Sequence, residues 1–67
     1  MTRQIIKDRN FRIIGYIEDI SEDRQKALDA RFTILGYYDR RRDVTTDARF
    51  IIVGRGNMLA ALIDRAR

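Results

Sequence analysis

The residues that could do chemistry in this chain are carboxylates, tyrosines and arginines, because its 67 residues include no His and no Cys. Imidazole is the commonest general base and metal ligand, so its absence removes every His-based nucleophilic triad. Without Cys, disulfides and thiolate metal sites are excluded. Ser21 is the only Ser, and no base accompanies it. The sequence therefore predicts a protein that is not an enzyme and has no cofactor and no metal site.

Three carboxylates recur at equivalent places: Asp8, Asp29 and Asp47 each begin a copy of the pattern D-x-[NR]-F-x-I-[ILV]-G. Such self-similarity indicates one supersecondary unit used three times. An Asp side chain can accept a hydrogen bond from the backbone N–H two residues on and so close a turn. We interpret the three Asp as turn residues, the alternative being acid/base catalysis or metal binding.

Each copy predicts a β-hairpin, in which the Asp turn joins a short strand to a β-branched strand. We place the hairpins at about residues 3–17, 25–38 and 43–55 of a single domain, residues 1–67. A Gly closes each copy of the pattern and predicts a bulge, a bend or a close backbone approach. These glycines are Gly15, Gly36 and Gly54.

One segment conflicts with the repeat. Residues 21–31 have the composition of a capped helix, with Ser at the start and acidic residues behind it. The repeat instead assigns residues 26–28 to a strand. We follow the repeat and retain at most one helical turn at residues 21–24.

Strict alternation along the outgoing strands predicts two apolar faces. It puts Phe11, Ile13 and Gly15 on one face, and Ile14 and Tyr16 on the other. A sheet with one wet face would show polar residues at half of these positions, so both sides need a cover. The Phe of each copy (Phe11, Phe32 and Phe50) is interpreted as a core residue, with an exposed ring at a partner site as the alternative.

The end of the chain predicts a short helix at about residues 57–66, with Asn57 as its N-cap. Its apolar stripe consists of Met58, Leu59, Leu62 and Ile63. A helix of this length is unstable alone, so the stripe either covers the sheet of its own chain or packs against another subunit as an assembly element. An interfacial membrane anchor is a further alternative, whereas spanning a membrane needs about 20 apolar residues.

The charge balance is +4, and the basic excess lies in the C-terminal half. It permits attraction to nucleic acid or to an anionic surface. An alternative function is therefore nucleic-acid binding through Arg40, Arg41, Arg42 and Arg49, with aromatic rings nearby. No targeting segment is recognisable, which predicts a cytoplasmic protein.

Residues 8–17 (Asp-Arg-Asn-Phe-Arg-Ile-Ile-Gly-Tyr-Ile), together with residues 53–63, resemble the bacterial four-fold β-flower proteins. The resemblance implies β-hairpin petals around a pseudo-symmetric axis, a shallow barrel with an apolar central channel, and no established activity. Only three repeats are present where four petals are implied. The fourth would come from a degenerate segment, from the C-terminal element or from a second chain. A second departure is that Phe stands at the turn position where the family has Gly.

These observations predict a mainly β fold of three or four hairpin petals with a short C-terminal helix. The expected function is a non-enzymatic binding or scaffolding module that assembles into a homo-oligomer. A small apolar or lipid-like ligand with an anionic end would enter at the axis, lined by the residues that follow the three Gly, namely Tyr16, Tyr37 and Arg55.

Overall fold

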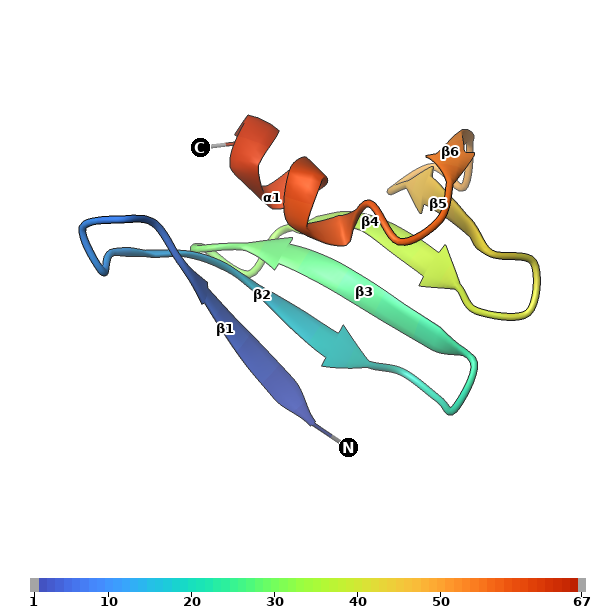
Figure 1. Ribbon diagram of the computed structural model, residues 1–67, viewed down its shortest axis with the longest axis horizontal. Coiled ribbons are helices and arrows are strands. Elements are labelled where there is room, and N and C mark those ends of the chain that lie inside the picture. The colour runs from blue at the N-terminus through green and yellow to red at the C-terminus, as the bar shows by residue number, and fades with distance from the viewer. Residues whose placement is uncertain (1, 67) are drawn as a thin grey trace.

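The computed structural model describes residues 2–66, which form six strands and one helix. They are β1 (Arg3–Lys7), β2 (Ile13–Asp19), β3 (Arg24–Asp29), β4 (Ile34–Asp39), β5 (Val44–Asp47), β6 (Ile52–Arg55) and α1 (Leu59–Ala66). Each strand pairs antiparallel with the next one along the chain, in the order β1-β2-β3-β4-β5-β6 (Figure 1). The prediction of a mainly β fold with a C-terminal helix is confirmed.

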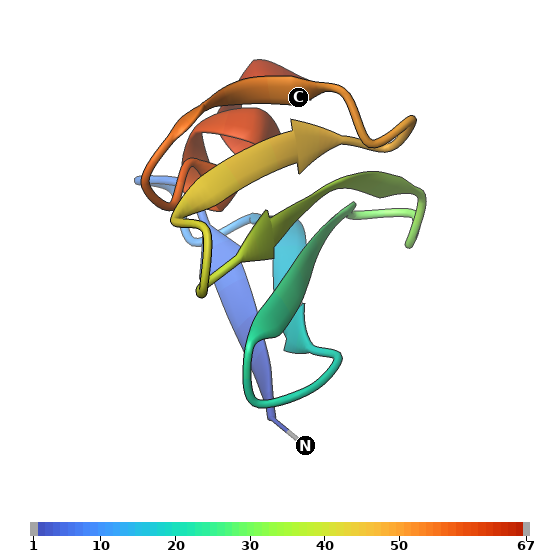
Figure 2. The ribbon, with the colours of Figure 1, turned by 90° about the vertical axis from the view of Figure 1, so that its right-hand side faces the viewer.

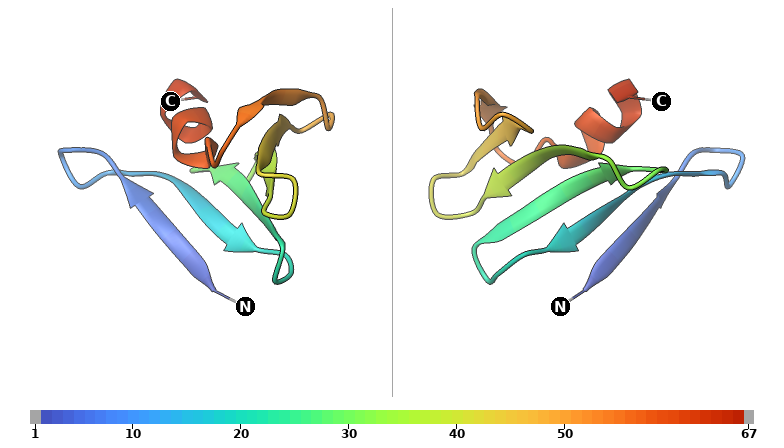
Figure 3. Two further views of the ribbon diagram at one scale, coloured as in Figure 1. Left: turned by 45° about the vertical axis from the view of Figure 1, so that its right-hand side comes forward. Right: turned by 180° about the vertical axis from the view of Figure 1, so that it is seen from behind.

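The sheet is open, with β1 and β6 as its two edges. It twists strongly, so that β1 and β6 run in clearly different directions (Figure 2). The helix α1 lies on the side toward which β5 and β6 curl (Figure 3). The structure shows one open sheet. The arrangement of the hairpins as petals around an axis stays a prediction.

The segment with helical composition is a strand, as the repeat predicts. Ala27 and Leu28 are buried in β3, between β2 and β4. Burial between two strands outweighs the helix propensity of these residues, which is a weak local preference. Residues 21–23 form a bend rather than a helical turn, and the Ile20 N–H donates to the Arg24 carbonyl at 2.9 Å.

The three hairpin turns have the same hydrogen bonds. In the first, Asp8 Oδ1 accepts the N–H groups of Asn10 at 2.8 Å and Arg12 at 3.0 Å, and the Phe11 N–H donates to the Asp8 carbonyl at 3.0 Å. The turns that begin at Asp29 and Asp47 repeat each of these bonds to within 0.1 Å. The Asp carboxylates are therefore engaged in holding the turns.

The Phe of each turn occupies the left-handed backbone region, with φ of 63° at Phe11, 67° at Phe32 and 68° at Phe50. This region closes a three-residue hairpin loop and favours Gly, because a bulky side chain is strained there. The interpretation of the three Phe as core residues is wrong. Their side chains project from the turns and are 81%, 51% and 61% exposed.

A β-bulge in each hairpin breaks the strict alternation. The pairing of β1 with β2 passes from Lys7 opposite Ile13 to Ile6 opposite Gly15, so Ile14 is the extra residue. The same break occurs at Leu35 and Val53. Ile14 and Leu35 pack against the core under the helix, on the same side of the sheet as the glycines. The prediction that Ile14 and Gly15 face opposite sides is therefore wrong.

The core lies between α1 and the sheet. Leu59 and Ile63 have no exposed surface and pack against Ile17, Ala27 and Tyr38. The apolar stripe of the helix therefore packs against the sheet of its own chain in this structure. Met58 and Leu62 are half-buried, whereas Leu59 and Ile63 have no surface left for another subunit while the helix stays packed in this way.

Two side chains fix the start of the helix. Asn57 Oδ1 accepts the Leu59 N–H at 3.1 Å, as expected of an N-cap. The buried Thr45 hydroxyl accepts the Met58 N–H at 2.9 Å and donates to the Gly56 carbonyl at 2.7 Å. Thr45 thereby joins β5 to the segment between β6 and α1.

Candidate functional site

The face of the sheet away from α1 carries two stacked pairs of rings. Tyr16 stacks on Phe32 with 4.6 Å between the ring centroids and 13° between the planes. Tyr37 stacks on Phe50 with 4.7 Å and 12°. In both pairs the Tyr follows the Gly of one hairpin, and the Phe comes from the turn of the next hairpin. The rings therefore join neighbouring repeats.

Arginine side chains cover these rings. The Arg3 guanidinium carbon lies 5.4 Å from the centroid of Tyr16 and 5.2 Å from that of Phe32. The Arg24 guanidinium lies 5.7 Å from the Tyr37 centroid. These distances are within the range of cation–π attraction. We call the set Arg3, Tyr16, Phe32, Arg24, Tyr37 and Phe50 the aromatic ladder.

Glu18 keeps one of these arginines in place. Its carboxylate accepts Arg3 Nη2 at 2.5 Å and lies 3.5 Å from Lys26 Nζ on the neighbouring strand. The Glu18 side chain is 18% exposed and the Arg3 side chain 52%, so the Arg3–Glu18 pair is partly open to solvent and contributes little to stability. Glu18 thereby links Arg3 of the ladder to Lys26 on β3.

The aromatic ladder ends at both edges of the sheet. Within residues 2–66 no ring stacks on Phe11, and residues 2–7 contain no Tyr. At the other edge, Arg55 occupies the position that Tyr16 and Tyr37 hold in the earlier repeats, and residues 56–66 contain no Phe. The exposed Phe11 and the exposed Arg55 are therefore the two open ends of the ladder.

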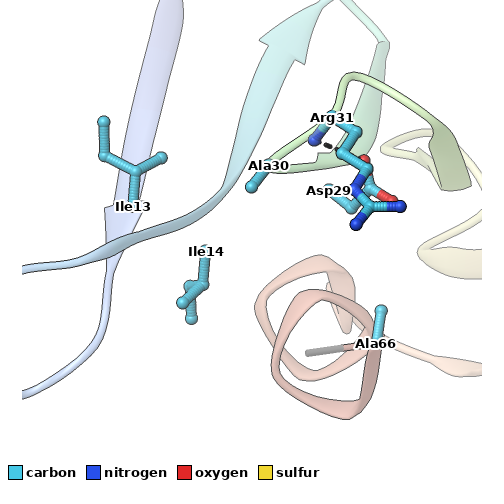
Figure 4. A pocket seen from close by; sticks show the side chains of 6 residues that line it. All are labelled: Ile13, Ile14, Asp29, Ala30, Arg31 and Ala66. Atoms are coloured by element: carbon cyan, nitrogen blue, oxygen red, sulfur yellow. Dashed lines mark hydrogen bonds between the residues drawn. The ribbon is translucent and has the colours of Figure 1, made fainter.

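A row of isoleucines accompanies the ladder. The side chain of Ile13 points away from α1, opposite to that of Ile14 (Figure 4). Ile34 and Ile52 hold the same place in the next two hairpins, and Ile5 lies opposite Tyr16 on β1. The four isoleucines are between 37% and 62% exposed. The face that α1 leaves uncovered is therefore apolar and aromatic, with arginines around it.

The residues predicted to line an axis, Tyr16, Tyr37 and Arg55, lie on β2, β4 and β6. Another strand separates each of them from the next, so they form a row rather than a cluster. Each Tyr ring is occupied by a Phe of the following hairpin. The exposed ring of Phe11 agrees with the alternative weighed for the three Phe, whereas the stacking of neighbouring repeats was missed from the sequence. The signal available in the sequence was that a turn Phe follows each of these Tyr, 16 residues after Tyr16 and 13 residues after Tyr37.

A hollow of about 410 Å³ lies between the second turn and the end of α1, lined by Ile13, Ile14, Asp29, Ala30, Arg31 and Ala66 (Figure 4). The Asp29 carboxylate accepts two backbone N–H groups of its own turn. Arg31 is the remaining charged side chain of the lining. Neither Tyr16 nor Tyr37 nor Arg55 contributes to this hollow.

The arginines considered for nucleic-acid binding lie apart. Arg40, Arg41 and Arg42 belong to the connection between β4 and β5, whereas Arg49 lies in the turn at the other end of β5. Arg41 pairs with Asp23 at 2.8 Å, and Arg42 lies 3.8 Å from Asp39. Carboxylates therefore offset part of the charge of the triplet.

Two titratable groups are shifted by hydrogen bonds. The Thr2 hydroxyl, 2.5 Å from Asp19 Oδ2, and then the Gln25 amide lower the pKa of Asp19. The Tyr38 hydroxyl donates to Asp43 at 2.7 Å, and this bond raises the pKa of Tyr38. Both groups support loops at the end of the sheet opposite to the Asp turns.

No helix within residues 2–66 is long and apolar enough to cross a membrane. Comparison of the chain with family models, with curated proteins and with solved structures found no match. Membership of the β-flower family therefore stays a prediction from residues 8–17 and 53–63.

Proposed function

We propose that this chain is a non-enzymatic binding module that assembles with further copies of itself. The observation that carries the proposal is the uncovered face, where four exposed isoleucines accompany the aromatic ladder. A chain of this size has a marginal core. Burial of a contiguous apolar patch in an assembly supplies the apolar contacts that one chain lacks.

Assembly would also complete the arrangement of petals and create the binding place for a ligand. Three hairpins in an open sheet leave an arrangement around an axis incomplete, and hairpins from a second chain would complete it. A small apolar molecule with an anionic end would then bind at the shared axis, beside the arginines of the ladder.

The test is the mass in solution, measured by sedimentation velocity over a hundredfold range of protein concentration. We expect an oligomer for the wild type and a shift toward monomer for the double variant Ile34→Thr, Ile52→Thr. Ile20→Thr is the matched control, because Ile20 is also exposed (40%) but lies in the bend between β2 and β3. A wild type that is monomeric throughout overturns the proposal.

Nucleic-acid binding is the second candidate, and the exposed guanidinium groups of Arg41 and Arg42 favour it. Affinity carried by phosphate contacts falls steeply with salt. Fluorescence anisotropy of a labelled single-stranded oligonucleotide at 50 and 200 mM salt separates the candidates. Binding at low salt that Arg41→Ser, Arg42→Ser abolishes supports this second function, and no binding at 50 mM salt rejects it.

A further inference from the structure

The junctions between hairpins follow one rule within the chain. Where β2 meets β3, Gly15 lies opposite Asp29 and Tyr16 opposite Leu28. Where β4 meets β5, the equivalent residues pair in the same register, Gly36 with Asp47 and Tyr37 with Thr46. In both junctions the Tyr stacks on the Phe three residues after that Asp.

The edge strands hold the two halves of a third junction. β6 presents Gly54 and Arg55, the equivalents of Gly15 and Tyr16. β1 presents Lys7 and is followed by Asp8, the equivalents of Leu28 and Asp29. We propose that the β6 edge of one chain pairs with the β1 edge of a second copy in this register, so that Phe11 of the second copy stacks on Arg55. This inference rests on the proposed function and specifies its partner and its contacts.

The chemistry at the two ladder ends is complementary. Phe11 offers an open ring that is 81% exposed. Arg55 offers a planar guanidinium, which stacks well on an aromatic ring. Arg42 stands five residues before Asp47, as Arg3 and Arg24 stand five residues before their Asp, and its side chain is 80% exposed. Unlike Arg3 and Arg24, which lie on strands, Arg42 belongs to the turn between β4 and β5 and lies 3.8 Å from Asp39.

Backbone strain at Phe11 supports the same partner. Phe32 and Phe50 share the left-handed conformation of Phe11, and each is compensated by a stacked Tyr. Phe11 carries the strain without such a ring within residues 2–66. Strained residues persist where a contact offsets their cost, and the third junction supplies that contact from a second chain.

The same register puts Lys7 opposite Arg55. Like charges directly opposite each other weaken a strand pair, so this junction is weaker than the two internal ones. The pairing is also short, because β6 ends at Arg55. Pairing weakened by this repulsion gives reversible assembly. Reversing one of the two charges then tests the register.

The experiment compares dissociation constants from sedimentation equilibrium for the full chain. Lys7→Glu places an acid opposite Arg55 and is expected to strengthen assembly about fivefold to tenfold. Phe11→Gly is expected to weaken it about threefold, by loss of the cation–π contact. Arg9→Glu is the matched control, with the same change of net charge in the exposed first turn. Equal effects of Lys7→Glu and Arg9→Glu would overturn the register.

Cross-linking identifies the paired edges directly, because the chain has no Cys of its own. Residues directly opposite on antiparallel strands have Cα atoms about 4.5–5.5 Å apart, within disulfide range. A mixture of Lys7→Cys and Arg55→Cys chains should therefore form the mixed disulfide in excess over either homodimer. A dominant Lys7→Cys homodimer would instead show β1 pairing with β1 and reject the proposal.

The outcomes separate the two proposals. An oligomer that responds to Ile34→Thr, Ile52→Thr but not to Lys7→Glu or Phe11→Gly leaves the proposed function standing and removes this edge pairing. A monomer in the wild type and in Lys7→Glu at every concentration removes both.

Discussion

Phe32 stacks on Tyr16 across two adjacent hairpins, with 4.6 Å between the ring centroids, while its own backbone is held at a φ of 67°. The two facts belong together. The left-handed turn position aims the Phe side chain back over the preceding repeat, where the Tyr and Arg3 receive it. A residue that is locally unfavourable in the turn thus contributes to the contact between repeats.

Replacement of the turn Phe by Gly should therefore have different effects in the first and second repeats. Gly removes the strain of the left-handed conformation, which costs about 1–2 kcal/mol. It also loses more backbone entropy on folding, which costs about 0.5–1 kcal/mol. Phe11→Gly should raise the free energy of unfolding by about 0.5–1 kcal/mol. Phe32→Gly also loses a ring stack worth about 0.5–1.5 kcal/mol, so we expect no gain or a loss. Urea unfolding at a concentration where both variants are monomeric is the measurement, and an equal gain in both would contradict the role of the stack.

The bulge glycines should differ in their tolerance of Ala. A methyl group at Gly15 would lie 2.5 Å from the Leu28 carbonyl oxygen and 2.6 Å from Ile63 Cγ2. At Gly54 it would meet the flexible end of Met58 instead. We expect Gly15→Ala to destabilise by about 1–3 kcal/mol through overpacking, and Gly54→Ala to cost clearly less. Thermal unfolding followed by circular dichroism decides, and equal costs would mean that α1 does not press on β2 as described.

Much of this architecture could be predicted from the sequence, because the repeat overrides local propensity. Residues 24–29 would be helical by composition, yet the alignment of Lys26 with its equivalents on β1 and β5 identifies a strand. The Asp turns and the Asn57 cap are local motifs and could be assigned for the same reason. Such features depend on neighbours close in sequence.

The side-chain arrangement could be predicted less well. One bulge per hairpin moves Ile14 to the helix side and turns Ile13 to the uncovered face, and alternation alone cannot locate a bulge. A Phe is expected in the core on hydrophobicity, whereas its exposure here follows from a φ that no sequence rule assigns to Phe. The ladder depends on pairing between hairpins, so it became visible only with the register.

Two adjacent threonines on β5 should respond oppositely to Val. The Thr45 hydroxyl has two partners, the Met58 N–H and the Gly56 carbonyl. The Thr46 hydroxyl is buried and has no hydrogen-bond partner within residues 2–66. Thr45→Val should cost about 1–3 kcal/mol by leaving buried backbone groups unpaired, whereas Thr46→Val should be neutral or stabilising by up to about 1 kcal/mol. The two variants have the same composition, so the difference in their melting temperatures reports the hydrogen bonds alone. A Thr46→Val variant that melts well below the wild type would show that this hydroxyl has a partner after all.

Acid should weaken the fold partly through Asp19. Because hydrogen bonds from Thr2 and then Gln25 lower the pKa of Asp19 in the folded chain, the folded state binds its proton less readily than the unfolded state, whose Asp pKa is about 3.9. The carboxylate therefore adds stability that is fully present well above pH 4 and is lost as the pH falls through the folded pKa. We expect Asp19→Asn to be less stable than the wild type at pH 7, and the difference between them to narrow as the pH falls below 4. Glu22→Gln, which removes an exposed acid from the neighbouring bend, is the control for the change of net charge. A difference between wild type and Asp19→Asn that stays constant from pH 7 to pH 3 would show that these bonds do not favour the ionised carboxylate.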